Sequence, residues 1–225
     1  MIVDLNLKGR QVVVIGAGKE AVRKVESLIH EDCEVIVIAE SVVDVIQRLA
    51  TEKKIILRIA HLVDGKFLDE FDRLILVMAA TNNIELNRVV AMQAREKGCY
   101  AYSVDDPLHS DFSYPATFSL YDTIQISVST GGRSPLMAGK IREIIEPVMK
   151  DLVKSEDSLQ VHLQSRLRDI VKQKLPTPGA RKQYLRAMLA DKEICQLLSQ
   201  DKLKEAEAMA LKKLEHFQLR SSAEC

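Results

Sequence analysis

Residues 11–30 read QVVVIGAGKEAVRKVESLIH, and this stretch decides the fold. The β-branched run 11–15 shows no polar alternation, which is typical of a parallel strand buried on both faces. Gly16 and Gly18 interrupt the run, and apolar residues then recur at helical spacing over residues 20–30. The order of strand, glycine turn and helix is that of the first unit of a dinucleotide-binding sheet.

The alternation of strands and helices continues to residue 104. Further strands are expected at 34–38, 55–60, 73–79 and 99–104, with helices at 42–50 and 84–97 and a short helix or turn at 65–71. Strands that alternate with helices form parallel sheets through right-handed crossovers. We therefore predict an α/β fold, a Rossmann-like doubly wound parallel sheet over residues 1–112.

The pattern changes after Pro107. Strand-like runs at 113–118 and 123–129 have no helix between them, so we expect them to form a hairpin or to pair with another chain. A helix is expected at 134–150, and only helical periodicity follows, at 159–174, 179–189, 192–199 and 202–217. These patterns predict a small α/β dimerisation segment over residues 113–150 and a helical C-terminal domain over residues 151–225.

Composition narrows the class of protein. The 225 residues are 47% hydrophobic and 28% charged, which excludes a disordered chain. Lys plus Arg and Asp plus Glu both number 32, so no basic excess indicates a nucleic-acid partner. The four cysteines are too sparse for a disulfide framework, and no His or acidic cluster has metal-ligand spacing. We find neither a signal peptide nor an apolar run of membrane-spanning length, and so expect a cytoplasmic protein without a membrane partner.

The glycine turn has the pattern G-x-G-x-x-A, from Gly16 through Gly18 to Ala21. The first glycine permits a tight turn, the second lets a pyrophosphate approach the backbone, and Ala21 allows close packing of helix on sheet. The helix N-terminus supplies free N–H groups and the positive end of the dipole. The alternative is a glycine turn that merely connects strand to helix.

Polar residues at the ends of the second and fourth strands complete a candidate cofactor site. Glu40, 24 residues after Gly16, can accept hydrogen bonds from the adenosine ribose and would repel a 2′-phosphate, which favours NAD over NADP. Glu40 could instead be an exposed residue that opens the next helix, and Ser41 lies beside it. Thr81 lies in a run of small residues at the predicted switch point, where Asn82 or Asn83 could simply cap a helix.

Asp105, Asp106 and Pro107 follow the fifth strand at the same edge of the sheet. A carboxylate there would face the nicotinamide end of a bound cofactor and could act as a general base, although Asp-Asp-Pro is also a common turn. We interpret His61 and His109 as surface or loop histidines. The turn at residues 130–134 could bind an anion at a helix N-terminus or merely join a strand to a helix.

Four segments together resemble the precorrin-2 dehydrogenase family, also called the siroheme synthase N-terminal module. They read VVVIGAGKEAVRKVESLI, VMAATNNIELNRVVAMQAREKG, SVDDPLHSDFSYPATF and ISVSTGGRSPLMAGKIRE, and the tail segment KLPTPGARKQYLRAML also looks like the family's helical domain. The resemblance covers nearly the whole chain. It departs from the family at the N-V-x-D motif, where Tyr102 and Ser103 replace Asn and Val, and at residues 120–122, which replace a basic turn.

The resemblance implies NAD-dependent oxidation of precorrin-2 to sirohydrochlorin by a homodimer. It implies Asp105 as the catalytic aspartate and cofactor contacts at Lys19, Glu20, Glu40 and Ser41. Some members of the family also insert ferrous iron, so a dehydrogenase that is also a ferrochelatase is one alternative. A non-catalytic NAD-sensing module is another. Arg133, Lys140 and Arg142 are local candidates for binding the carboxylates of a tetrapyrrole, and no methyltransferase module is expected.

Overall fold

The chain folds into two compact units, Met1–Tyr114 and Pro115–Cys225. The structure is a computed structural model that describes residues 2–223, with side chains up to residue 218. Each unit has its own hydrophobic core. The division of the second unit into a dimerisation segment and a helical domain stays a prediction.

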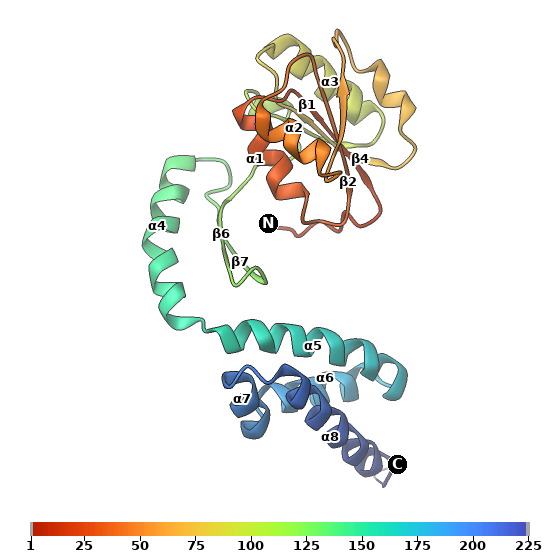
Figure 1. The fold of residues 1–225 in the computed structure, drawn as a ribbon, viewed down its shortest axis with the longest axis vertical. Helices are drawn as coiled ribbons and strands as arrows, with labels where there is room; N and C mark the ends of the chain where they lie inside the picture. Colours follow the sequence, from red (N-terminus) through yellow and green to blue (C-terminus); the bar gives the residue numbers. More distant parts are fainter. Residues whose placement is uncertain (1, 224–225) are drawn as a thin grey trace. The chain divides into compact units, whose positions relative to one another are not determined.

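The first unit is a five-stranded parallel sheet in the order β3-β2-β1-β4-β5, with helices on both faces (Figure 1). This confirms the predicted doubly wound α/β fold. The five strands predicted for this unit are all present, with ends that differ by at most one residue, whereas the two strands predicted at 113–118 and 123–129 lie at 116–120 and 124–128. The strands are β1 (Gln11–Ile15), β2 (Glu34–Ala39), β3 (Ile56–Ile59), β4 (Leu74–Ala79) and β5 (Tyr100–Ser103).

Alternate residues of β1 face two separate cores, because successive side chains of a strand point to opposite faces. Val12 and Val14 pack with α1 (Lys19–Leu28) and α2 (Asp44–Thr51). Val13 and Ile15 pack instead with α3 (Ile84–Glu96), and a short 3₁₀ helix, Lys66–Glu70, lies where the sequence allowed a helix or turn. Burial on both faces explains why the strand is an uninterrupted β-branched run.

A hairpin begins the second unit. Strands β6 (Ala116–Leu120) and β7 (Ile124–Val128) pair antiparallel, so the hairpin alternative is correct. The two turn residues, Tyr121 and Asp122, have φ of +53° and +56°, as a type I′ turn requires. Helix α4 (Pro135–Leu152) packs on both strands.

Four further helices pack around one apolar core: α5 (Ser155–Lys174), α6 (Pro178–Leu189), α7 (Lys192–Ser199) and α8 (Leu203–Ala223). Tyr184 is fully buried among them, and its hydroxyl donates to the carbonyl of Ala210 at 2.6 Å. Cys33, Cys99 and Cys195 are free thiols, while Cys225 lies outside the described residues. Among the described helices, none is long and apolar enough to cross a membrane.

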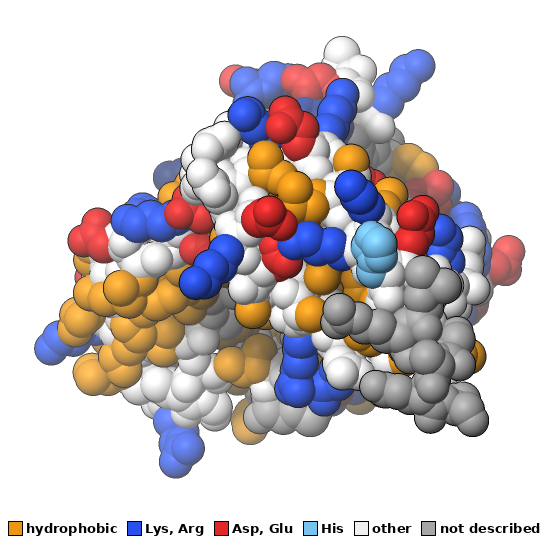
Figure 2. Space-filling model, turned by 90° about the horizontal axis from the view of Figure 1, so that it is seen from below, with side chains coloured by type: hydrophobic (Ala, Val, Ile, Leu, Met, Phe, Trp, Pro, Cys, Tyr) orange, Lys and Arg blue, Asp and Glu red, His pale blue; other side chains and the backbone are white. Residues whose placement is uncertain are grey.

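Helix α4 exposes a row of large apolar side chains. Met137, Ile144, Val148 and Leu152 recur every four to seven residues and are 47%, 60%, 53% and 68% exposed. Hydrophobic side chains gather at the left of Figure 2, the side on which α4 lies in Figure 1. Contiguous apolar surface of this kind marks interaction sites.

Candidate cofactor and catalytic site

The predicted site residues meet at the carboxyl edge of the first unit's sheet. Backbone hydrogen bonds continue the strand ladder beyond the strand ends: Gly16 N–H donates to Ile38 O at 2.9 Å, and Ala80 N–H donates to Ile15 O at 2.9 Å. Val104 N–H likewise donates to the carbonyl of residue 79 at 3.0 Å. Because β1 lies between β2 and β4, the strand order reverses at this edge, where open α/β sheets bind ligands.

Gly16 is required by close backbone approach as well as by its conformation. Its φ is +94°, and a Cβ placed there would lie 2.4 Å from the carbonyl oxygen of Ala80. The turn after β1 is therefore pressed directly against the end of β4, and a side chain would force the two apart. This contact fixes the position of the turn, and so of the first residue of α1, relative to the carboxyl end of β4.

Gly18 has the opposite environment. It precedes the first residue of α1, has an ordinary φ of −84°, and an added Cβ would meet nothing within 4 Å. No side chain caps the start of α1, while Ala21 is fully buried against the sheet. The chain thus leaves open space beside uncapped N–H groups, which is the cradle that a pyrophosphate needs. The exposed Lys19 and the half-buried Glu20 flank it, and Glu20 pairs with Arg23 at 2.9 Å.

Glu40 follows the last residue of β2, and its side chain is 62% exposed. His61 lies just beyond β3, and its Nδ1 is 2.5 Å from Oε1 of Glu40. Sequence reasoning missed this pair because it treated His61 as an isolated surface histidine. The sequence did contain a signal for this pair, because Glu40 and His61 each follow one of two consecutive strands of the predicted parallel sheet. Ser41 is exposed beside Glu40.

Thr81 follows β4 and is held by a buried amide. The Asn87 side chain is fully buried in α3 and bonds Thr81 three times, through the threonine N–H at 3.1 Å, hydroxyl at 2.6 Å and carbonyl at 2.9 Å. Asn83 caps α3, since its Oδ1 accepts from Leu86 N–H at 3.1 Å. Asn87 was also missed, although it is a polar residue on the apolar face of a helix.

The two aspartates after β5 differ in their surroundings. Asp106 accepts hydrogen bonds from Leu108 N–H, His109 N–H and His109 Nδ1 at 3.1, 3.2 and 2.5 Å, so it closes the turn. Burial acts to raise the pKa of Asp106, but these hydrogen bonds outweigh it and hold the pKa below its usual value. Asp105 is exposed and has no hydrogen-bond or ion-pair partner among the described residues.

Tyr102 is a residue of β5, stands at the position of the family's asparagine and packs against the core that includes α1. Its ring lies 5.4 Å from Phe112 and 5.3 Å from Tyr114, and Lys24 Nζ lies 3.7 Å above the Tyr114 ring. Burial raises the pKa of Tyr102, and the negative charges of Glu20 and Asp105 raise it further. The Tyr102 side chain thus experiences the negative charges of both Glu20 and Asp105.

These residues fit a nicotinamide dinucleotide. Glu40 lies at the β2 side of the switch point, the open cradle at Gly18 lies in the middle, and Thr81 and Asp105 follow β4 and β5 on the other side. All residues that the sequence assigned to the cofactor or to catalysis thus lie at one edge. Among the described residues, no cluster of three His, Cys, Asp or Glu side chains could hold a metal ion.

Comparisons with known proteins define the class. Residues 3–116 match the NAD(P)-binding family model, so the first unit is an NAD(P)-binding domain. Residues 122–146 match the central region of sirohaem biosynthesis proteins, and residues 161–214 match the sirohaem synthase dimerisation region. The chain belongs to the family of siroheme synthase N-terminal modules that the motifs indicated.

Individual relatives agree with this assignment. The siroheme synthase of Baumannia cicadellinicola subsp. Homalodisca coagulata is 29% identical over 95% of this chain and 44% of the relative. The siroheme synthase of Methylococcus capsulatus is 32% identical over 92% of this chain and 42% of the relative. The chain thus spans less than half the length of these relatives. The structure of SirC, precorrin-2 dehydrogenase, has the same fold, with a TM-score of 0.64, 19% identity, and coverage of 94% of this chain and 99% of that one.

Proposed function

We propose that the protein oxidises precorrin-2 to sirohydrochlorin with NAD. The observation that carries the proposal is the arrangement of the sheet edge: a glycine cradle at the switch point, an acid beyond β2, and an unpartnered carboxylate beyond β5. This arrangement provides separate places for the adenosine, the pyrophosphate and the reacting end of a dinucleotide. The family to which the chain belongs supports the substrate assignment.

Each residue has a distinct role in this proposal. Glu40 accepts hydrogen bonds from the adenosine ribose, and the N–H groups at the start of α1 bind the pyrophosphate. Bound NAD supplies the acceptor for the hydride that leaves a ring carbon of the substrate. Asp105 accepts the proton, since its carboxylate is exposed, unpartnered and at the carboxyl edge of β5. Asn87 holds the backbone and hydroxyl of Thr81 in place, so the cofactor packs against a small side chain with a fixed position.

The protein acts as a homodimer in this proposal, in the cytoplasm. The match of residues 161–214 to a dimerisation region supports two subunits, and the exposed apolar row on α4 offers surface for their contact. Among the suggested substrate-binding cations, Arg142 is already paired with Glu146 at 2.7 Å. Lys140 has no ion pair among the described residues, and Arg133 Nε donates to the Thr130 carbonyl at 3.2 Å.

Incubation of the purified protein with precorrin-2 tests the proposal. We expect sirohydrochlorin and an equal amount of NADH when NAD is present, and no product without NAD. Parallel samples with ferrous iron distinguish the simple dehydrogenase from a dehydrogenase that also forms siroheme, because only the second changes the final absorption spectrum. NAD binding without any turnover would contradict the proposal and favour an NAD-sensing module.

A further inference from the structure

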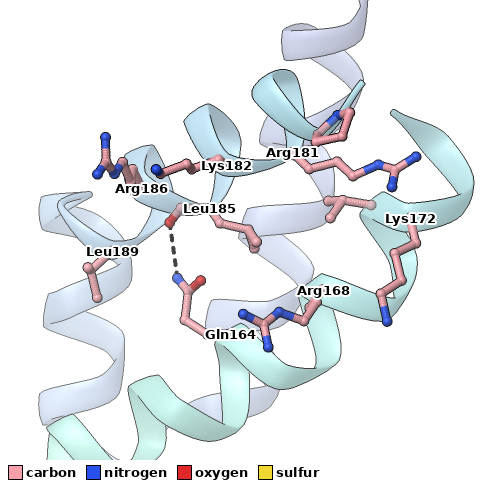
Figure 3. A pocket seen from close by; sticks show the side chains of 10 residues that line it. Gln164, Arg168, Lys172, Arg181, Lys182, Leu185, Arg186 and Leu189 are labelled. Carbon is pink, nitrogen blue, oxygen red and sulfur yellow. Dashed lines mark hydrogen bonds between the residues drawn. The ribbon is translucent and has the colours of Figure 1, made fainter. Parts of the chain in front are cut away.

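A basic pocket lies in the second unit, within the helical region. Helices α5 and α6 border a hollow of about 510 Å³, and Figure 3 shows the side chain of Leu185 directed between the two helices. The lining includes five cations and no acid: Arg168, Lys172, Arg181, Lys182 and Arg186. The other lining residues include the buried Val171 and the apolar side chains of Leu185, Leu189 and Pro178.

The positive charge is concentrated at this place in the sequence. Residues 164–189 contain seven Lys and Arg residues but one acid, Asp169, although the whole chain has equal numbers of both signs. An ordinary solvated helix surface mixes the two signs. Like charges one helical turn apart repel each other, and both Arg168 with Lys172 and Lys182 with Arg186 have this spacing.

Three of the lining cations have neither an ion pair nor a side-chain hydrogen bond among the described residues. Arg181 donates to the carbonyls of Leu175 and Pro176 at 2.7 and 3.1 Å, so its guanidinium is used within the fold. Lys172 has Asp169 at 3.5 Å. Arg168, Lys182 and Arg186 form no ion pair or side-chain hydrogen bond among the described residues. They line the pocket from both helices, Arg168 from α5 and the other two from α6.

We infer that this pocket binds an amphiphilic polycarboxylate, meaning a ligand with an apolar body and at least two carboxylates. Two arginines favour carboxylates because guanidinium groups form paired hydrogen bonds with them. The apolar lining residues favour a ligand with its own apolar surface over a bare inorganic anion. The inference does not depend on the proposed oxidation, since the pocket lies entirely in the second unit.

The test uses the full chain and uroporphyrin, a stable tetrapyrrole octacarboxylate, as the probe. Binding is followed by the change in porphyrin fluorescence for the wild type and for Arg168→Gln/Arg186→Gln. We expect the double variant to bind about tenfold or more weakly, because each lost charge-assisted hydrogen bond is expensive. The Lys192→Gln/Lys204→Gln variant removes the same charge from α7 and α8, and it should bind as the wild type does.

Further arms identify the source of the signal. The pocket variant and the Lys192/Lys204 control both leave the first unit unchanged, so a difference between them cannot come from binding at the catalytic edge. Inorganic phosphate and tricarballylate, which lack a large apolar body, should compete weakly. Equal loss in the Lys192/Lys204 control, no binding by the wild type, or equal competition by phosphate would overturn the inference. So would dissociation of the Arg168/Arg186 variant's dimer in sedimentation, since these cations would then belong to the subunit contact.

Discussion

Nδ1 of His61 lies 2.5 Å from Oε1 of Glu40, although the two residues are 21 positions apart in the sequence. Strands β2 and β3 are neighbours in the sheet, and their carboxyl ends bring the two side chains together. The carboxylate that we assign to the adenosine ribose therefore has a fixed partner. His61 orients the Glu40 side chain through this hydrogen bond.

Replacement of Glu40 by Arg should reverse the cofactor preference. The substitution removes the ribose acceptor and supplies a cation for a 2′-phosphate, so NAD affinity should fall about tenfold or more while NADP affinity rises. Calorimetry with both dinucleotides measures the change. His61→Ala is the matched control, because it keeps the acid and should still prefer NAD. A wild type that prefers NADP would show that Glu40 has no such role.

Alanine at the two glycines should separate folding from cofactor binding. Gly16→Ala should destabilise the first unit by at least about 1–2 kcal/mol, because φ is positive and the Cβ clashes with the Ala80 carbonyl. Gly18→Ala should leave stability nearly unchanged but weaken NAD about tenfold or more, since the methyl group enters the space beside the helix start. Urea unfolding and NAD titration of both variants check this. Equal NAD binding by Gly18→Ala and wild type would mean that the pyrophosphate lies elsewhere.

Charge on the exposed face of α4 should disrupt the dimer. Ile144→Glu/Val148→Glu places two carboxylates in the apolar row, so the subunits should separate if this row is buried between them. Sedimentation velocity should then show a mass near 25.3 kDa instead of twice that value. Val63→Glu, at an even more exposed apolar residue of the first unit, should remain dimeric. An unchanged dimer in the α4 variant would exclude this face as the subunit contact.

Acid should weaken the helical unit through Asp191. Its carboxylate caps α7 by accepting from Glu193 N–H and Ile194 N–H, both at 3.1 Å, and it also accepts from Lys213 of α8. Burial acts to raise the pKa of Asp191, but the Lys213 and backbone hydrogen bonds outweigh it, so the pKa lies below its usual value. A carboxyl with a lowered folded-state pKa stabilises the fold above its unfolded pKa, near 4, and this stabilisation is lost as the pH falls through the folded pKa.

Asp191→Asn should therefore flatten the decrease in unfolding free energy below about pH 4, because asparagine keeps the cap but cannot titrate. Asp191→Ala should lose about 0.5–2 kcal/mol at neutral pH through loss of the cap. Urea unfolding followed by helical circular dichroism at several pH values provides both numbers. The same acid-induced loss in Asp191→Asn and wild type would assign the effect to other carboxylates.

The sequence predicted the sheet well because burial on both faces leaves a strong local pattern. Strand β1 and the glycine turn are examples, since their residue types follow from their own backbone positions. The side-chain pairs at the site were harder to predict. Glu40 with His61, and Thr81 with Asn87, depend on which strands and helices become neighbours, and that information is spread over the whole chain.

The central claim is that Asp105 accepts the proton while Asp106 only closes the turn. The measurement is precorrin-2 turnover with NAD by Asp105→Asn and Asp106→Asn, with NAD affinity determined for both. Asp105 is exposed and unpartnered, so Asp105→Asn should fold normally and bind NAD, yet lose about 10²–10⁴-fold in rate. Asp106→Asn should lose much less. Near-normal turnover by Asp105→Asn would contradict the account, because the proton would then go to another group or to solvent.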